Sequence, residues 1–256
     1  MLSTKQLRTF ARDGYLLVPG VVEEALLAEL DAEVNDTIDR DPPPADKVGF
    51  HHYFRDWTST PVAERVLREG GVLDLARELV APLPIDWAFD QVQFATSIQG
   101  WDHQPGGGHI DGYGMKGQTA PFTFTLLAGV YLDDESAPGR GNIWVWPGSH
   151  LGHQQLFRER GLDVLLPLDG HACMLRPAPD WGRGQPVLAR RGDVLLAHYL
   201  LAHNQSGNLG HAIPLRRIVY YRLAAEGHRQ RWTATHTDAL LEFQAVRQAL
   251  HPPEGE

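Results

Sequence analysis

From Asp86 onward, the chain is a succession of short apolar and aromatic runs, each bounded by Gly, Pro or Asp clusters. These runs cover residues 87–96, 122–134, 141–150, 172–177, 185–203 and 215–224. Runs of this length and composition, separated by turn residues at this spacing, are typical of strands in a sandwich or barrel. The sequence therefore predicts a mainly β core over residues 86–235.

The first 85 residues follow a helical pattern instead, and the chain also ends in one. Apolar residues recur at helical spacing, and Ser3 and Gly14 are suited to begin and end the first helix. We expect these helices to pack outside the β core. The expected elements are helices over 4–13, 23–38, 61–80 and 237–250, a strand over 15–18, and a loop that starts at Asp41–Pro44 and continues through 50–57.

The length of 256 residues is within the range of a single β domain, and the chain shows no internal repeat and no low-complexity linker. We therefore expect one domain over residues 1–256. Within it, residues 1–85 are mostly helical, residues 86–235 form the core, and residues 236–256 form a C-terminal helix and tail.

The net charge of −9 argues against nucleic acid or an anionic membrane as a partner. The sequence has no run of about 18 apolar residues. Its first residues carry charges where a signal peptide has its apolar segment. We expect a soluble, cytoplasmic protein that acts on a small molecule; its oligomeric state is left open.

The segment GGGHIDGYG places His109 and Asp111 two residues apart. In an extended chain both side chains point to one face and can share a metal ion. Because Cys173 is the single cysteine, a metal site has to use His, Asp or Glu. A third ligand is expected from GDVLLAHYLLAHNQSG, where His203 ends an apolar run and His198 is the competing residue.

Two imidazoles and one carboxylate leave positions open on a metal ion, which suits ferrous iron with a chelating co-substrate and dioxygen. An open zinc site has the same ligand types. A keto acid would also need a cation for its distal carboxylate, and a guanidinium can hold it through two hydrogen bonds. Arg216 and Arg217 are adjacent on a predicted strand, so we expect one of them to face the site.

Four segments, in order, resemble the phytanoyl-CoA hydroxylase-like family of Fe(II)/2-oxoglutarate dioxygenases. The opening LSTKQLRTFARDGYLLVPGVVEEALLAEL is similar to its first helix, strand and helix, and GGGHIDGY is similar to its HxD metal motif. The family's acidic turn and PGSH corner resemble YLDDESAPGRGNIWVWPGSH in this sequence. The strand that carries its distal histidine resembles GDVLLAHYLLAH.

The resemblance implies a double-stranded β-helix (jelly-roll, cupin-like) core with flanking N-terminal and C-terminal helices. It implies an enzyme that uses Fe(II), 2-oxoglutarate and O2, and that releases succinate and CO2 as it oxidises a small molecule. The implied iron ligands are His109, Asp111 and His203, and Arg216 is implied to bind 2-oxoglutarate. Related halogenases lack the carboxylate, so the presence of Asp111 favours hydroxylation or another oxidation, such as desaturation or cyclisation.

Other predictions concern the surroundings of the metal. Gln93 is a candidate contact of the co-substrate or substrate. Loop and motif residues are candidates to line the substrate: His51, His52, Tyr53, Phe54, Trp57, His103 and Tyr113. His150 and His153 could form a second metal pair, but the resemblance favours a structural corner there.

Two alternatives stay open. One is a non-catalytic jelly roll that binds a small molecule, and the other is a cupin-like Zn- or Mn-dependent hydrolase or isomerase, which would have no use for Arg216. Formation of succinate separates the oxygenase from both. The negative net charge also favours a free metabolite over a CoA ester as the substrate.

Overall fold

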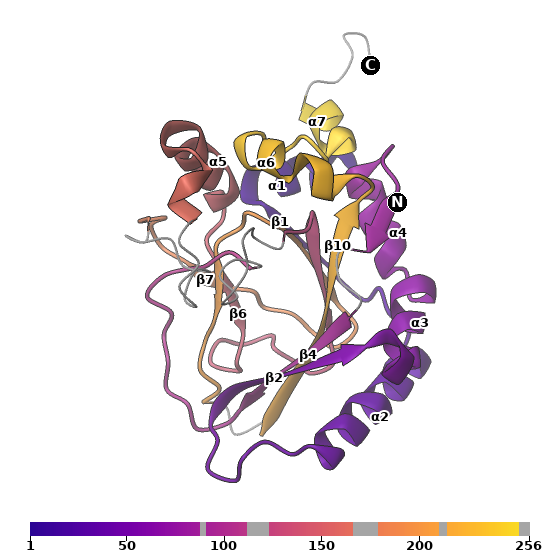
Figure 1. Cartoon of the computed structure of the whole chain (residues 1–256). Helices are drawn as coiled ribbons and strands as arrows, with labels where there is room; N and C mark the ends of the chain where they lie inside the picture. The colour runs from indigo at the N-terminus through magenta and orange to yellow at the C-terminus, as the bar shows by residue number, and fades with distance from the viewer. Residues whose placement is uncertain (88–90, 112–122, 166–178, 210–213, 251–256) are drawn as a thin grey trace.

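The structure is a computed structural model that describes residues 1–87, 91–111, 123–165, 179–209 and 214–250 (Figure 1). Within these ranges the main feature is a seven-stranded antiparallel sheet. In sheet order its strands are β1 (Tyr15–Val18), β8 (Val194–His198), β5 (Leu126–Tyr131), β10 (Leu215–Ala225), β4 (Gln91–Ile98) and β2 (Gly49–Asp56), with β3 (Ile85–Trp87) also paired to β10.

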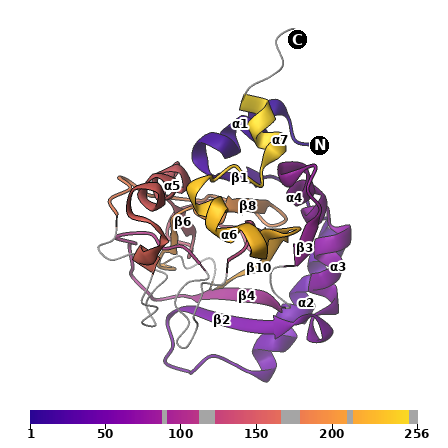
Figure 2. The same ribbon diagram turned by 45° about the horizontal axis from the view of Figure 1, so that its top comes forward.

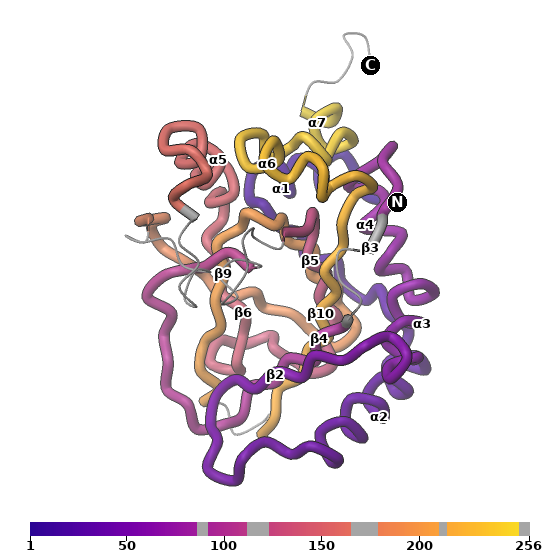
Figure 3. The backbone as a smooth tube through the Cα atoms, in the orientation of Figure 1, coloured from indigo at the N-terminus to yellow at the C-terminus, as the bar shows by residue number. Residues whose placement is uncertain are grey.

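A second, three-stranded antiparallel sheet lies against the first. Its order is β7 (Gln185–Pro186), β6 (Ile143–Val145) and β9 (His203–Gln205). Apolar side chains of both sheets form one buried cluster, in which Val145 meets Tyr131 and Ile218. Figure 3 follows the backbone through both sheets. The predicted jelly-roll class with flanking helices is confirmed; the described strands form two open sheets, not a closed barrel.

Helices cover one end of the molecule and the face of the large sheet that points away from the three-stranded sheet. They are α1 (Thr4–Asp13), α2 (Glu24–Arg40), α3 (Pro61–Glu69), α4 (Val72–Val80), α5 (Ser149–Arg160), α6 (His228–Thr237) and α7 (Gln244–Leu250), with 3-10 turns η1 (Trp57–Ser59) and η2 (Leu162–Leu165). The first and last helices, α1 and α7, lie side by side (Figure 2). No helix in the described ranges is long and apolar enough to cross a membrane.

The strands of the large sheet are buried on both faces. On β10, Val219 and Tyr221 join a cluster with side chains of α2, α3 and α4, whereas Ile218 and Tyr220 join the cluster between the sheets. We call the first face outer and the second face inner. Because side chains alternate along a strand, this parity decides which residues of β10 reach the space between the sheets.

The predicted first helix is confirmed with its caps. The Ser3 hydroxyl accepts from the Gln6 backbone N–H, and the Gln6 side chain accepts from the Ser3 backbone N–H, which is a capping box. Gly14 ends the helix at φ 79°, a conformation that favours glycine. The second helix was expected over 23–38 and lies at Glu24–Arg40.

The structure corrects three expected elements. The loop expected over 50–57 is mostly strand β2, which pairs with β4 along its whole length, since aromatic residues favour strands. The helix expected over 61–80 is two helices, because Gly71 has φ 80° and interrupts it. The helix expected over 237–250 is confirmed only as α7, at Gln244–Leu250: α6 lies before this range and ends at Thr237, and the Asp238 side chain accepts from the Leu240 N–H in a local turn between the two helices.

Two other expectations complete the comparison of elements. Helix α5 was not expected, and it begins at Ser149 inside the PGSH corner, after Gly148 at φ 81°. The strand expected over 172–177, with Cys173, lies outside the described residues.

Candidate metal centre

The backbone places two histidines from distant segments opposite each other. His109 and His203 form an isolated antiparallel bridge. The His109 N–H donates to the His203 carbonyl at 2.9 Å, and the His203 N–H donates to the His109 carbonyl at 3.1 Å. β9 therefore extends its pairing to the HxD segment, and the two imidazoles are neighbours whose ring centroids lie 4.6 Å apart.

Gly108 permits this close pairing. A Cβ atom at Gly108 would lie 2.7 Å from the Trp146 ring and 2.8 Å from the Ala202 Cβ. The Asn204 side chain also donates to the Gly107 carbonyl at 2.8 Å. Of the three glycines at the start of the motif, Gly108 is thus the one that close packing against the segment of His203 requires.

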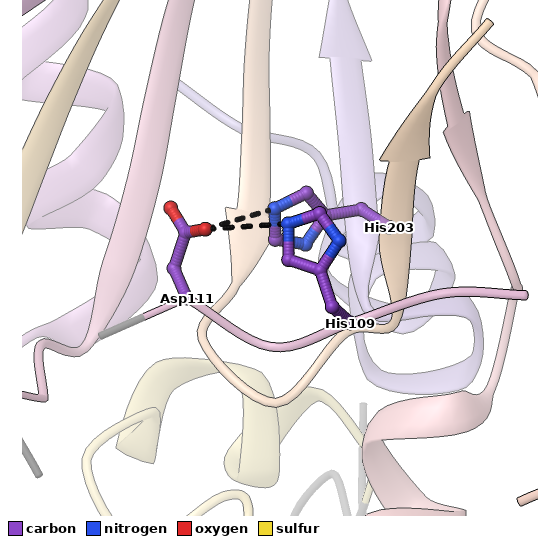
Figure 4. A group of neighbouring side chains, drawn as sticks. All are labelled: His109, Asp111 and His203. Atoms are coloured by element: carbon purple, nitrogen blue, oxygen red, sulfur yellow. Dashed lines mark ion pairs between the residues drawn. The ribbon is translucent and has the colours of Figure 1, made fainter. Parts of the chain in front are cut away.

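Asp111 completes the group, as the i, i+2 spacing predicts. Its Oδ1 lies 3.6 Å from Nε2 of His109 and 3.5 Å from Nε2 of His203 (Figure 4). Two ligands that are each about 2.1 Å from one ion can be up to about 4.2 Å apart. One ion between these three atoms therefore fits the distances, and the ligand atoms all lie within 4.8 Å of one another.

Hydrogen bonds fix the orientation of the ligand atoms. The Nδ1–H of His203 donates to the Leu201 carbonyl at 3.0 Å, so Nε2 carries the lone pair that faces Asp111. Oδ2 of Asp111 accepts from Nη2 of Arg222 at 2.7 Å. One carboxylate oxygen is thus held by Arg222, and the other faces the two imidazoles.

The charges around the group keep the carboxylate ionised. Burial raises the pKa of Asp111, but Arg222, His109 and His203 together hold this pKa well below its usual range. Burial lowers the pKa of His109 despite its hydrogen bond to Asp111. Burial also lowers the pKa of His203, but Asp111 outweighs it and raises the pKa above its usual value.

The other candidate histidine ligands lie elsewhere. His198 is buried, with its Nε2 at 2.7 Å from the Ala239 carbonyl and its Nδ1 accepting from the Leu200 N–H. His150 contacts the Ala11 carbonyl, and His153 contacts the Leu200 carbonyl. Within the described ranges, His109, Asp111 and His203 are the only group of three His, Cys, Asp or Glu side chains that meets the distance for one ion.

Arg216 and Arg217 point to opposite faces of β10. Arg217 lies on the outer face, where its Nε and Nη2 donate to Asp133 and its Nη1 donates to Asn35. Arg216 is fully buried on the inner face, with its Nε 2.8 Å from Oε1 of Glu135. The Arg216 nitrogens lack a hydrogen bond of good geometry to any described residue, as do the hydroxyls of Tyr131 and Tyr220.

Two predicted residues lie on the inner face of the large sheet. His52 contacts the Gln205 side chain at 3.3 Å, and burial lowers the pKa of His52 to about 4, with Arg216 lowering it further. Gln93 is buried on β4, in register with Tyr220 and Phe54. Both residues therefore lie close to the space between the sheets.

An aromatic row on the same face of β2 contains Phe50, His52 and Phe54. The exposed Phe54 ring lies 6.0 Å from the Arg222 guanidinium, which holds Asp111. His103 stacks on Trp101 with ring centroids 4.2 Å apart, and Trp101 contacts Phe50. His103 is thus at the far end of this row.

The structure corrects three expected substrate contacts. His51 and Tyr53 face outward on β2, because strand parity puts them on the face opposite to His52, and Tyr53 packs with the helices. Trp57 stacks on Tyr221, which is also on the outer face. Tyr113 lies outside the described residues.

Sequence reasoning missed Arg222 and Glu135. Arg222 lies six residues after Arg216, and this even spacing on one strand places both on the same face. That spacing could have predicted that Arg222 faces the site together with Arg216. Glu135 follows β5 in an irregular segment, where no periodicity indicates the direction of a side chain.

The donor set agrees with an open metal site. Two imidazole nitrogens and one carboxylate oxygen from the described residues form the group, and a structural zinc site would need a fourth ligand. Two neutral imidazoles and one carboxylate are typical ligands of non-haem ferrous iron. Nη1 and Nη2 of Arg216, which lack a hydrogen bond of good geometry to a described residue, provide in addition a buried binding group for an anion.

The fold is shared with solved structures at low identity. HygX from Streptomyces hygroscopicus, crystallised with nickel and 2-oxoglutarate, is 20% identical, with 89% of this chain and 88% of that chain covered and a TM-score of 0.61. The α-ketoglutarate-dependent epimerase SnoN from nogalamycin biosynthesis is 19% identical, with 86% of this chain and 81% of that chain covered and a TM-score of 0.63.

AviO1 from Streptomyces viridochromogenes Tue57 is 21% identical, with 89% of this chain and 97% of that chain covered and a TM-score of 0.59. A comparison with curated proteins finds no match. The family model of phytanoyl-CoA dioxygenase (PhyH) matches residues 10–218, which contain the two histidines, the aspartate and Arg216. The chain belongs to the phytanoyl-CoA dioxygenase (PhyH) family.

Proposed function

We propose that the protein is an Fe(II)- and 2-oxoglutarate-dependent oxygenase that hydroxylates a small molecule. The observation that carries this proposal is one arrangement between the two sheets: three metal-binding side chains, and a fully buried arginine without a hydrogen-bond partner of good geometry among the described residues. A metal-dependent hydrolase would use the three metal-binding side chains alone. The arginine favours an enzyme that also binds an acidic co-substrate.

His109, Asp111 and His203 would hold the iron. When bound, iron with 2-oxoglutarate supplies the oxidising chemistry, in which 2-oxoglutarate and O2 give succinate and CO2. The protein orients the ligands: Leu201 sets the His203 ring, and Arg222 holds one oxygen of Asp111. Holding this oxygen favours a carboxylate that gives one atom to the metal, so that positions stay open.

Arg216 would bind the distal carboxylate of 2-oxoglutarate. A buried guanidinium without good hydrogen bonds is costly, and a carboxylate can accept two parallel bonds from it. The hydroxyls of Tyr131 and Tyr220 near this arginine also lack described partners, and they are further donors for such a ligand. Arg217 is unsuited to this role, because Asp133 and Asn35 accept from its nitrogens.

Substrate would bind at the inner face of β2, where His52 and the exposed Phe54 lie near the metal group, with Gln93 beside them. HygX has been crystallised with hygromycin B, and SnoN with nogalamycin RO, so proteins of this fold accept small molecules. SnoK is described as a carbocyclase and SnoN as an epimerase. The carboxylate ligand Asp111 argues against a halogenase, and among the remaining oxidations we propose hydroxylation here.

The test is whether the protein converts 2-oxoglutarate to succinate with Fe(II) and O2. Slow turnover without a substrate is sufficient, and it is measured by chromatography of the products. We expect succinate from the wild type and from His51→Ala, whose ring is on the outer face, and none from His109→Ala. Metal-bound wild type that makes no succinate under these conditions would favour the hydrolase or the binding protein.

A further inference from the structure

The partner of Arg216 is as completely buried as Arg216 itself. Both Arg216 and Glu135 have no exposed side-chain surface. Their contact is between Oε1 of Glu135 and Nε of Arg216, at 2.8 Å, at one edge of the guanidinium. This contact is an ion pair, because Nε, Nη1 and Nη2 all lack a hydrogen bond of good geometry to a residue in the described ranges. The opposite edge of the guanidinium carries Nη1 and Nη2.

The neighbouring arginine shows the alternative arrangement. Asp133 accepts from both Nε and Nη2 of Arg217, at 3.1 and 2.8 Å. Nη1 of Arg217 donates to Asn35 at 2.9 Å, so this guanidinium is occupied on all sides. Oε1 of Glu135 instead lies 2.8 Å from Nε of Arg216, and neither terminal nitrogen of Arg216 has a hydrogen bond of good geometry within the described ranges.

The backbone of Glu135 is held in place. The buried side chain of Asn142 donates to the Glu135 carbonyl at 2.8 Å and contacts the Val187 carbonyl at 3.3 Å. Glu135 also forms an isolated antiparallel bridge with Ala189. Because the backbone of Glu135 is held by these contacts, its side chain can fix the direction of the Arg216 guanidinium.

We propose that Glu135 is a positioning residue for co-substrate binding: its carboxyl group holds the Nε edge of Arg216, so that Nη1 and Nη2 face the distal carboxylate of 2-oxoglutarate. This inference rests on the proposed function. Burial raises the pKa of Glu135 to about 8, although Arg216 opposes this shift. In either protonation state the group keeps an oxygen that can face Nε, so a glutamine should replace it.

The experiment measures the affinity for 2-oxoglutarate of the anaerobic Fe(II) protein by calorimetry, in wild type, Glu135→Gln, Glu135→Asp and Glu135→Leu. Glu135→Gln should bind like the wild type. Glu135→Asp has its carboxyl group one methylene further back, and Glu135→Leu has none. Both should bind 2-oxoglutarate at least about tenfold more weakly, because the contact that orients the charged guanidinium is lost. Fe(II) affinity should stay constant in all four.

Asp133→Ala is the matched control, because it removes the acid of the outer pair and should leave 2-oxoglutarate affinity unchanged. If Glu135→Asp and Glu135→Leu both bind like the wild type, the carboxyl group does not position Arg216. If Glu135→Gln and Glu135→Leu both bind more tightly, Glu135 competes with the co-substrate, and the proposal is wrong. Should Glu135→Leu fail to fold, the pair Glu135→Gln and Glu135→Asp decides alone.

The failure of the proposed function gives a different result. Wild-type protein that binds Fe(II) but no 2-oxoglutarate would overturn the oxygenase proposal, and the role of Glu135 with it. Wild-type binding with unchanged Glu135 variants overturns the role of Glu135 alone.

Discussion

At the scale of single residues, two histidines of the same segment lie in different surroundings. His203 is half-buried, and its Nε2 faces Asp111. His198 is buried among the rings of Phe10 and Phe243, and both of its nitrogens contact backbone groups. The first histidine is available to a metal, and the second belongs to the core.

This difference predicts opposite effects of two substitutions. His203→Ala should lower the affinity for Ni(II) or Co(II) by more than about 100-fold, because it removes a ligand. His198→Ala should keep the metal affinity and lower the free energy of unfolding by about 2–4 kcal/mol, because it leaves a cavity and an unpaired Leu200 N–H. Metal titration and urea unfolding measure the two quantities; weaker metal binding in His198→Ala alone would reverse the ligand assignment.

At the scale of elements, β10 carries both arginines of the site, Arg216 and Arg222. Strand periodicity was sufficient to predict that Arg216 and Arg217 face opposite ways, and the structure agrees. The partners of these residues could not be predicted. Glu135 and Asp111 approach β10 from irregular segments, whose path depends on tertiary packing and not on any local pattern.

β2 shows how local signals failed. The prolines of residues 42–44 correctly indicated a loop, but the aromatic run after them belongs to an edge strand that pairs with β4. Phe54 is exposed and Tyr53 is buried, but both are aromatic. The two faces of β2 therefore do not differ in polarity, and the sequence shows no alternation of polar and apolar residues that would indicate a strand. The strand places His52 beside Arg216 and moves His51 away from the site.

The HxD segment gives a prediction at this scale. Gly108→Ala should lower metal affinity at least tenfold and the free energy of unfolding by about 1–3 kcal/mol, since the new Cβ overlaps Trp146 and Ala202 and displaces His109. Gly106→Ala is the control, because a Cβ at Gly106 meets nothing within 4 Å. Equal metal affinities of the two variants would show that close packing at Gly108 does not position the ligand.

At the scale of the whole molecule, several buried histidines join the helices to the sheets. His153 contacts the Leu200 carbonyl from α5, and His236 of α6 packs against Phe157 and Tyr199. Burial lowers the pKa of His150 to about 4, that of His153 to about 3 and that of His236 to about 4. These residues are neutral in the folded protein at pH 5 to 7.

Stability should therefore fall as the pH is lowered below about 6.5, the pKa of an unfolded histidine. In this range the unfolded chain binds protons that the folded protein does not, so each such histidine costs up to about 1.4 kcal/mol per pH unit until its folded pKa is reached. Urea unfolding of the metal-free protein at pH 7.5, 6.5 and 5.5 measures the slope. His153→Asn, which keeps a donor for the Leu200 carbonyl, should reduce this slope by the equivalent of about one proton. A free energy of unfolding that does not depend on pH would contradict the conclusion that these histidines are neutral in the folded protein.

The central claim is that one site binds iron through His109, Asp111 and His203 and 2-oxoglutarate through Arg216. The most direct test is anaerobic titration of the metal-free protein with Fe(II) and then 2-oxoglutarate, monitored by the weak visible charge-transfer band of the chelate. The band should form in the wild type and in Arg217→Met, be absent in His109→Ala, and require much more 2-oxoglutarate in Arg216→Met. Iron binding without any band in the wild type would contradict the claim.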